Sequence, residues 1–269
     1  MTTSNPNTSE KILVLGHTGL LGGQVLEYFR HLDRDVITTD LRWPSSDFKE
    51  FVEKFEGIIV NCVGTIPQSG STDYSVNYEL PLFLLDNRKK FLHPDTDCVF
   101  SGNIPPGDSY EKDAMMDAEG SYANSKIRLV EEAKRRDVNN LRIIRTSIVG
   151  YDKGNKSLLS WFLKNAEEKG KCQGYVNHMW NGITTLQWSK VASELIDNWE
   201  NHDWITQVGS NHVSKYELLM MFSEVFRVPC EVEPVHTAKN VNKCLKSDIT
   251  VPDLRQQILD LAAWRTTCR

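Results

Sequence analysis

The sequence predicts an α/β protein with a Rossmann-like, doubly wound parallel sheet and a smaller C-terminal substrate lobe. Three observations predict this class. A glycine-rich turn follows the first apolar run, strand-like and helix-like segments alternate as far as Gly150, and the alternation fades beyond it. Such alternation is typical of a parallel sheet with helices on both faces.

The glycine-rich turn lies in the segment ILVLGHTGLLGG, Ile12–Gly23, which begins as a strand and continues as a helix to about Asp33. Gly16 permits a tight turn, Gly19 lets the backbone approach a diphosphate, and Gly22 lets helix and strand pack closely. The free N–H groups and the positive dipole end of the helix favour phosphate. The turn therefore predicts a nucleotide site.

A second strand, Val36–Thr39, ends at Asp40, where an acid that binds ribose is expected. Asp40 can accept hydrogen bonds from a 2′-hydroxyl, which favours NAD, whereas Arg42 can pair with a 2′-phosphate, which favours NADP. Both residue types are present. The predicted cofactor is therefore NADP or NAD, with the choice open.

Further elements follow in the order that the fold requires. The expected helices and strands of this half are Ser45–Glu56, Ile58–Val63, Tyr74–Phe91, Ser121–Arg136 and Asn140–Val149. Pro94 argues against a central strand through Phe91–Phe100, because proline cannot donate to a ladder. A short strand is expected before it, with a polar turn at Asp95–Asp97.

Helices are expected over Ser157–Lys169, Gln187–Trp199 and Ser214–Phe226, the last with a capping box formed by Ser214 and Glu217. The predicted organisation is a flexible leader over residues 1–10, a dinucleotide-binding domain over 11–150 and a substrate-binding lobe over 151–269. Part of the last segment can return to the sheet. A ligand cleft is expected between the lobes.

The composition narrows the class of protein. The 269 residues carry a net charge of −5 with no long basic run, which argues against nucleic acid or an anionic membrane as a partner. No apolar segment is long enough to cross a bilayer and the first residues lack a secretory signal, so a cytoplasmic protein is expected. The six cysteines form no CxxC pair and lack zinc-ligand spacing, which predicts reduced thiols and no metal site.

Tyr122 and Lys126 carry the predicted chemistry. In SYANSK they lie four residues apart on one helix face. An ammonium near a phenol lowers the phenol pKa, and such a phenol can give a proton to a carbonyl oxygen or take one from an alcohol. The ammonium can also hydrogen-bond a ribose.

A third partner is expected to be a hydroxyl at the strand edge before this helix. Thr96 lies in the polar turn and can orient a substrate carbonyl. Ser101 is the competing candidate, and Ser121 and Ser125 are weaker ones.

Taken together, these segments resemble the extended short-chain dehydrogenase/reductases, and within them the dTDP-4-dehydrorhamnose reductase family. The resemblance is carried by GHTGLLGG, by NCVGTI (Asn61–Ile66), by TDCVFSG (Thr96–Gly102), by SYANSK (Ser121–Lys126) and by RTSIVG (Arg145–Gly150). It spans nearly the whole chain and is specific in the first 150 residues. The family usually has a tyrosine where this chain has Cys98.

The resemblance implies a catalytic triad of Thr96, Tyr122 and Lys126. It places substrate near Asp97, Ile148 and, by possible stacking, Trp180. The implied cofactor-lining residues, which include Tyr122 and Lys126, are Gly16, Thr18, Gly19, Leu20, Leu21, Gly22, Asp40, Arg42, Cys62, Val63 and Gly64. The implied reaction reduces the 4-keto group of a 6-deoxy-4-keto sugar on a nucleoside diphosphate, with a hydride from nicotinamide and a proton from Tyr122.

Two other functions stay open. One is an epimerase or dehydratase that retains NAD, although such dehydratases usually have Asp-Glu after the threonine and Asp97 is followed by Cys98 here. The other is a non-catalytic, NAD(P)-binding regulatory subunit. Relatives also form homodimers through two helices, for which Tyr74–Phe91 and Ser121–Arg136 are the candidates; the sequence is equally compatible with a monomer.

Overall fold

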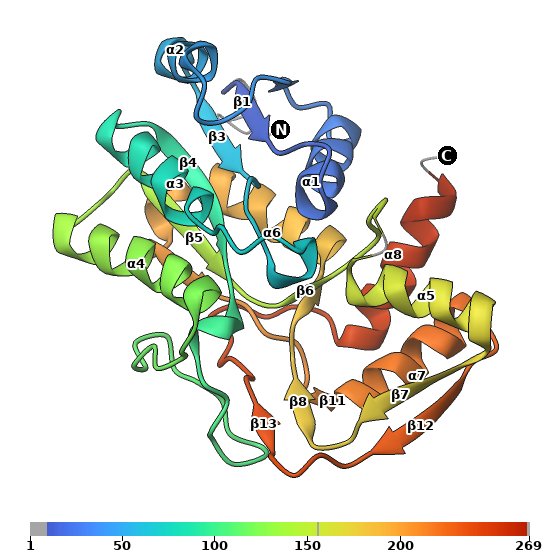
Figure 1. The fold of residues 1–269 in the computed structure, drawn as a ribbon. Helices are drawn as coiled ribbons and strands as arrows, with labels where there is room; N and C mark the ends of the chain where they lie inside the picture. The colour runs from blue at the N-terminus through green and yellow to red at the C-terminus, as the bar shows by residue number, and fades with distance from the viewer. Residues whose placement is uncertain (1–9, 155, 268–269) are drawn as a thin grey trace, which may run out of the picture.

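A six-stranded parallel sheet forms the centre of the molecule, which confirms the predicted class (Figure 1). The computed structural model describes residues 10–154 and 156–267, so the expected leader before Glu10, and Cys268, lie outside the described residues. The strand order is β10-β5-β4-β3-β1-β2. The strands are β1 (Ile12–Leu15), β2 (Val36–Thr38), β3 (Ile58–Asn61), β4 (Lys90–Asp95), β5 (Leu141–Arg145) and β10 (Ile205–Gln207).

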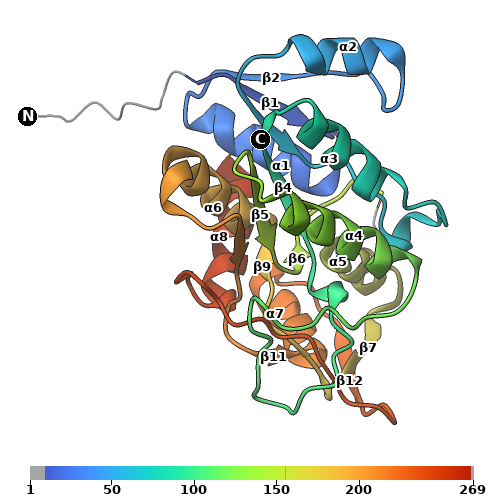
Figure 2. The ribbon, with the colours of Figure 1, turned by 90° about the vertical axis from the view of Figure 1, so that its left-hand side faces the viewer.

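Helices cover both faces of this sheet (Figure 2). One face packs against α1 (Leu20–His31) and α6 (Thr185–Asp197). The other packs against α2 (Ser46–Lys54), α3 (Val76–Asp86) and α4 (Ser121–Arg136). Because side chains alternate along a strand, Ile12 and Val14 join the first core and Leu13 and Leu15 the second.

The C-terminal lobe lies beyond the carboxyl edge of the sheet, where α5 (Leu158–Lys169), α7 (Lys215–Phe226) and α8 (Leu254–Thr267) share a third core. Short strands complete it, in the pairs β7 (Lys171–Tyr175) with β12 (Glu231–Val235) and β6 (Ile148–Val149) with β9 (Ile183–Thr184), and in the trio β8 (His178–Trp180), β11 (Val213–Ser214) and β13 (Val241–Asn242). Single 3-10 turns are η1 (Pro67–Ser69), η2 (Asp97–Val99) and η3 (Trp199–Asn201). Over the described ranges, every helix is too short or too polar to span a bilayer.

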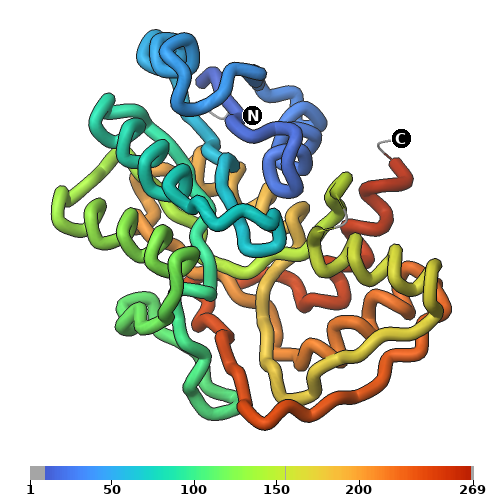
Figure 3. The backbone as a smooth tube through the Cα atoms, in the orientation of Figure 1, coloured from blue at the N-terminus to red at the C-terminus, as the bar shows by residue number. Residues whose placement is uncertain are grey.

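The chain passes between the main sheet and the C-terminal lobe several times, as the tube in Figure 3 shows. After β9 it returns to the sheet, where α6 packs against α1 and β10 pairs with β5. The loop after η2 runs beside the segment that follows β13, with backbone bridges from Asn103 to Asn242 and from Tyr110 to Leu245. The sheet edge and the lobe are thereby connected through segments far apart in sequence.

Pro94 lies inside a central strand, so the prediction that no such strand runs through it was wrong. It pairs with Ile144 of β5. The Phe91 N–H points to β5, where it donates to the Asn140 carbonyl over 2.9 Å. Because backbone N–H groups point alternately to the two neighbouring strands, the Pro94 nitrogen, which carries no hydrogen, points toward β3. The pairing of β3 with β4 ends at Leu92, before Pro94. The proline removes no ladder hydrogen bond.

Several other predicted elements differ in their bounds, and two of them differ most. The helix expected over Tyr74–Phe91 ends at Asp86, because Arg88 adopts a left-handed conformation with φ 51° and the chain turns into β4. The strand expected over Asn140–Val149 is observed as two strands, β5 and β6. β5 belongs to the main sheet, whereas β6 lies outside it and pairs with β9. By contrast, α4 has its predicted bounds and the Ser214 capping box is confirmed.

Candidate active site

The glycine turn connects β1 to α1 at the point where the strand order reverses between β1 and β3. Gly16 has φ +75°, and a Cβ there would lie 2.9 Å from the Cys62 carbonyl carbon. A Cβ on Gly22 would lie 2.3 Å from the Gly16 carbonyl oxygen. Side chains at these two positions would therefore collide with backbone, which is why the turn requires glycine.

The first turn of α1 is shaped to accept an anion. Gly19 is the N-cap residue and provides no side-chain cap. Helix geometry leaves the N–H groups of Leu20, Leu21 and Gly22 without intrahelical acceptors, and their positive dipole end points out of the helix. Thr18 and Gly19 are exposed beside them. This cradle of backbone donors fits a dinucleotide diphosphate.

A cavity of about 180 Å³ lies between this turn and the end of β2. Asp40, Arg42 and Val63 are among the residues that line it. Asp40 and Arg42 are both exposed, and the His17 Nε2 atom lies 3.6 Å from the Asp40 carboxylate. The cavity therefore presents the Asp40 carboxylate and the basic side chains of Arg42 and His17 to a ribose. This set of side chains is compatible with NAD and with NADP.

A second, larger cavity of about 1030 Å³ runs from the same turn between α1, α5 and α8. It borders His17 and Thr18, but Thr96, Tyr122 and Lys126 are not among its lining residues. The predicted catalytic residues thus lie outside this groove.

The segment after β3 contains the remaining residues that were predicted to line the cofactor. Cys62, Val63 and Gly64 follow the strand, and the Cys62 N–H donates to the Leu15 carbonyl over 3.0 Å. Burial raises the pKa of the Cys62 thiol, so it is a neutral, non-nucleophilic side chain. Asn77, which the sequence did not single out, holds the following loop by accepting from the Thr65 N–H over 2.7 Å.

The structure brings Thr96 and Tyr122 together. Thr96 directly follows β4 and is the N-cap of η2, where its hydroxyl accepts from the Cys98 N–H over 3.1 Å. Tyr122 lies in the first turn of α4, where the Thr96 hydroxyl is near enough to lower the pKa of its phenol, and it packs edge-on against the Tyr74 ring at 5.6 Å. A carbonyl oxygen placed between the two hydroxyls would have two hydrogen-bond donors.

The pKa of Tyr122 is raised above its ordinary value, chiefly because the phenol is buried. Nearby Cys98, Asp95 and Asp97 raise it further, and the Thr96 hydroxyl lowers it. The prediction that Lys126 lowers the pKa of this phenol was therefore wrong, since the pKa is raised and Lys126 is not among the groups that shift it. A phenol in this state is protonated at neutral pH and is ready to donate.

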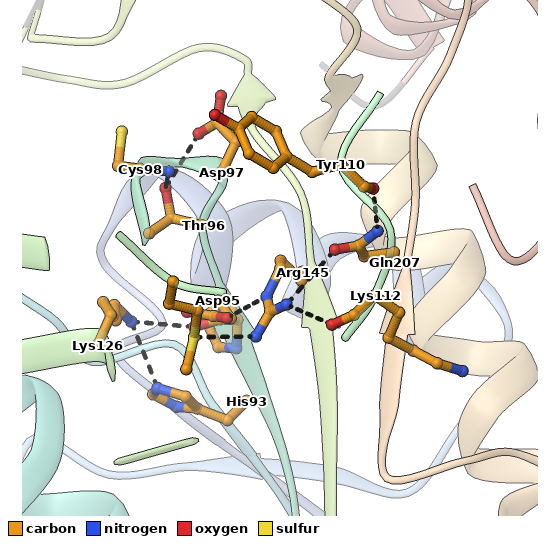
Figure 4. Close-up of polar contacts among 12 residues, drawn as sticks. His93, Asp95, Thr96, Asp97, Cys98, Tyr110, Lys112, Lys126, Arg145 and Gln207 are labelled. Atoms are coloured by element: carbon orange, nitrogen blue, oxygen red, sulfur yellow. Dashed lines mark hydrogen bonds and ion pairs between the residues drawn. The ribbon is translucent and has the colours of Figure 1, made fainter. Parts of the chain in front are cut away.

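Lys126 lies one turn further along α4, and its side chain is buried. Its ammonium donates to the Pro94 carbonyl over 3.0 Å and lies 3.4 Å from His93 Nε2 (Figure 4). Burial lowers the pKa of Lys126, and Asp95 and then Cys62 oppose that effect. His93 is held neutral, because burial and then Lys126 lower its pKa well below the usual range.

The competing hydroxyls are engaged elsewhere. Ser101 donates to Asp117 Oδ2 over 2.7 Å on the exposed side of the loop. Ser125 donates to the Tyr122 carbonyl over 2.7 Å, and Ser121 is exposed at the start of α4. Thr96 is the candidate that meets the phenol.

The three residues expected near substrate have different surroundings. Asp97 is buried and accepts from the Thr96 hydroxyl over 3.1 Å. Ile148 is half-buried in β6 at the sheet edge. Trp180 is buried in the lobe, with the Lys215 ammonium 4.8 Å from its ring centroid. One face of that ring is thus occupied by a lysine.

Lys215 is a further residue that sequence reasoning missed. It is the first residue of α7, and burial lowers its pKa to about 8 while Asp97 and then Cys98 oppose that effect. Its interaction with Asp97 connects the lobe to the sheet edge. Only its place directly after the capping residue Ser214 marks it in the sequence.

A buried ion pair was also missed. Asp95 and Arg145 are register partners at the ends of β4 and β5, and Arg145 Nε donates to Asp95 Oδ2 over 2.7 Å. The pairing depends on strand register, which a single sequence does not show. Within residues 10–154 and 156–267, no group of three metal-ligating side chains is found, and Cys62, Cys98, Cys172, Cys230 and Cys244 are free thiols.

Comparison with protein families gives a match over nearly the whole chain. A family model described as "RmlD substrate binding domain" matches residues 10–268. Among curated protein sequences, none matches the chain. The family match confirms the resemblance to dTDP-4-dehydrorhamnose reductases that the motifs predicted.

Solved structures share the fold at low sequence identity. A dTDP-4-dehydrorhamnose reductase from Bacillus anthracis, in complex with NADP, is 16% identical with a TM-score of 0.81, and one from Clostridium acetobutylicum is 16% identical with a TM-score of 0.78. Both matches cover 95% of this chain and 99% of the other. A dTDP-glucose 4,6-dehydratase from Bacillus anthracis, in complex with NAD, is 14% identical with a TM-score of 0.76, covering 96% and 97%.

Proposed function

Because the chain belongs to the RmlD substrate-binding-domain family, we propose that it is an NAD(P)H-dependent reductase of a nucleotide-linked 6-deoxy-4-keto sugar. Solved structures of similar fold include dTDP-4-dehydrorhamnose reductases, one of them with NADP. The single observation that carries the proposal is the family match over residues 10–268, and the Thr96 hydroxyl beside the Tyr122 phenol supplies the chemistry that it requires.

The glycine cradle at Gly16–Gly22, the Cys62–Gly64 segment and the Asp40–Arg42 loop would hold the dinucleotide. A bound NADH or NADPH supplies a hydride to the carbonyl carbon. Tyr122 and Thr96 orient the carbonyl oxygen, and Tyr122 gives its proton to that oxygen as negative charge develops. Lys126 holds positive charge beneath the site.

The reductase is preferred over an epimerase or dehydratase because the family match agrees with solved dTDP-4-dehydrorhamnose reductases of similar fold. A reduction ends with a proton on the new alkoxide, and the Tyr122 phenol is the group proposed to supply it. The dehydratase from Bacillus anthracis shares the fold, so the fold by itself does not separate these reactions.

The test is to supply a dTDP-linked 4-keto-6-deoxy sugar with NADH or NADPH and to follow cofactor oxidation and product mass together. A reductase oxidises one cofactor for each sugar reduced. Conversion of the sugar without net oxidation would instead establish an epimerase. A regulatory subunit would show neither reaction and would co-purify with another chain.

A matched pair of variants assigns the hydroxyl. Thr96→Val removes the hydroxyl that meets Tyr122 and should reduce turnover strongly, whereas Ser101→Ala removes one that faces Asp117 and should leave turnover unchanged. Equal turnover of Thr96→Val and the parent protein would remove Thr96 from the mechanism.

We also propose a cytoplasmic protein that binds a nucleotide sugar and assembles as a homodimer through α3 and α4. These two helices pack side by side on one face of the sheet, and Arg128 lies 4.1 Å from the Tyr78 ring centroid between them. Light scattering of the purified chain gives the assembly state, and a monomer mass would contradict the dimer.

A further inference from the structure

Asp95 is a buried carboxylate that the proposed reaction does not use. It is the last residue of β4, directly before Thr96, and its side chain is 2% exposed. Oδ2 accepts from Arg145 Nε over 2.7 Å. Oδ1 is also buried, and among the described residues it has no hydrogen-bond partner. An ionised oxygen in this position needs an electrostatic reason to stay there.

Arg145 by itself does not account for the whole carboxylate. Its guanidinium also donates to the Lys112 carbonyl over 3.2 Å and to Gln207 Oε1 over 3.4 Å, and it lies 5.5 Å from the Phe100 ring centroid. Figure 4 shows Gln207 and Lys112 on one side of Arg145, and Asp95 on the other side, toward Lys126. The Pro94 carbonyl that accepts from Lys126 over 3.0 Å directly precedes Asp95 in β4.

Lys126 is a buried cation whose direct partners are neutral. Its ammonium touches the Pro94 carbonyl and the neutral His93 ring, and within the described residues it forms no ion pair at 4.0 Å or less. The ionisable groups that interact with it are Asp95 and His93 from β4 and Cys62 directly after β3. Cys62 is a neutral thiol, so Asp95 is the anion among them.

We propose that Asp95 is a positioning residue shared by two buried cations: it ion-pairs with Arg145 and supplies the counter-charge that keeps Lys126 protonated beside Tyr122. The inference rests on the proposed function in so far as Lys126 acts there. Removal of this negative charge would leave two buried cations, and Lys126 is the one that can lose its proton, because arginine stays charged in proteins.

The direct test is the titration of Lys126 itself, which needs no sugar substrate. The full-length chain is labelled with ¹³C at lysine Cε, and Lys126→Arg identifies the Lys126 resonance. Asp95→Asn keeps the shape of the side chain and removes its charge. We expect Lys126 to lose its proton about one pH unit or more lower in Asp95→Asn than in the parent protein. Lys126 titrating at the same pH in both proteins would overturn the proposal.

The matched control is Asp86→Asn, which removes a carboxylate of the same kind from the exposed pair with Arg136. It should leave the Lys126 titration unchanged. If Asp95→Asn fails to fold because Arg145 is left unpaired, the double variant Asp95→Asn/Arg145→Gln removes both charges. Lys126 should still titrate lower there, because Asp95, and not Arg145, is among the groups whose charge acts on Lys126. An unchanged titration in the double variant would also overturn the proposal.

Turnover gives a separate readout. If the parent protein reduces a keto sugar, Asp95→Asn should lose activity over the pH range in which its Lys126 is neutral and keep more of it at lower pH. A parent protein without reductase activity would contradict the proposed function, while the lysine titration would still decide the role of Asp95.

Discussion

At the scale of single residues, the site is governed by burial more than by direct ion pairs. Burial raises the pKa of Tyr122 and lowers that of Lys126, so each group is biased toward its neutral form. Neighbouring Thr96 and Asp95 partly oppose those shifts. The electrostatic state of the site is therefore set by residues that need not touch the substrate.

Tyr122→Phe tests the proton donor. The variant keeps the ring that packs against Tyr74 and removes the hydroxyl. Turnover should fall by more than about 10²-fold, the lower end of what a general acid contributes, while NAD(P)H binding is kept. Steady-state kinetics and cofactor fluorescence titration measure the two quantities. Near-normal turnover would exclude Tyr122 as the donor.

The Asp40 and Arg42 pair tests the cofactor choice. Both residues line the cavity at the end of β2. Asp40→Ala should weaken NADH more than NADPH, because only the 2′-hydroxyl donates to a carboxylate, and Arg42→Ala should weaken NADPH more than NADH. Dissociation constants for the four combinations give the answer. Equal weakening of both cofactors would show that these residues do not recognise the ribose.

At the scale of elements, local signals predicted what local forces determine. The run at Ile12–Leu15, the amphipathic pattern of Ser121–Arg136 and the capping box at Ser214 each act within a few residues, and these three elements have the bounds expected. Pro94 was misjudged because its tolerance depends on which neighbour its missing N–H faces and where β3 stops pairing. That information belongs to the assembled sheet.

The glycine turn provides a prediction at this scale. Gly22→Ala would place Cβ 2.3 Å from the Gly16 carbonyl oxygen, whereas Gly23→Ala would place it 3.4 Å from the His17 carbonyl oxygen, an ordinary contact. Gly22→Ala should therefore weaken NAD(P)H binding and lower the Tm. Gly23→Ala should bind normally and gain up to about 1 kcal/mol of stability from helix propensity. Similar behaviour of both variants would contradict the packing argument.

At the scale of the whole molecule, the candidate site is made where the sheet edge meets the lobe. Motif spacing within the first half predicts Thr96, Tyr122 and Lys126 as the site, and their catalytic roles stay a prediction. The Asp95–Arg145 pair and the effect of Asp97 on Lys215 could not be predicted, because each joins segments that only the three-dimensional arrangement brings together. Motif spacing thus indicates candidate residues, but not the buried charges around them.

Lys215, between the C-terminal lobe and the sheet edge, predicts a pH dependence of KM. Lys215 has a pKa of about 8, so it is mostly protonated at pH 7 and loses its charge as the pH rises toward 9. A nucleotide sugar is anionic, so its KM should rise over that range, by roughly tenfold if one charge-assisted hydrogen bond is lost. Lys215→Met should show a high KM at both pH values. A parent KM that is constant from pH 7 to 9 would separate Lys215 from binding.

The return of the chain to the sheet after β9 limits how this protein can be divided. α6 supplies Trp188 and Leu195 to the same core as Val25 of α1, and β10 pairs with β5 as the outermost strand. A fragment that ends at Gly150 would lack β10 and α6. The apolar side chains of α1 that share a core with α6 would then be exposed to water. A chimera that exchanges the lobe with a relative must therefore be spliced at three junctions, near residues 150, 185 and 207, and not at one.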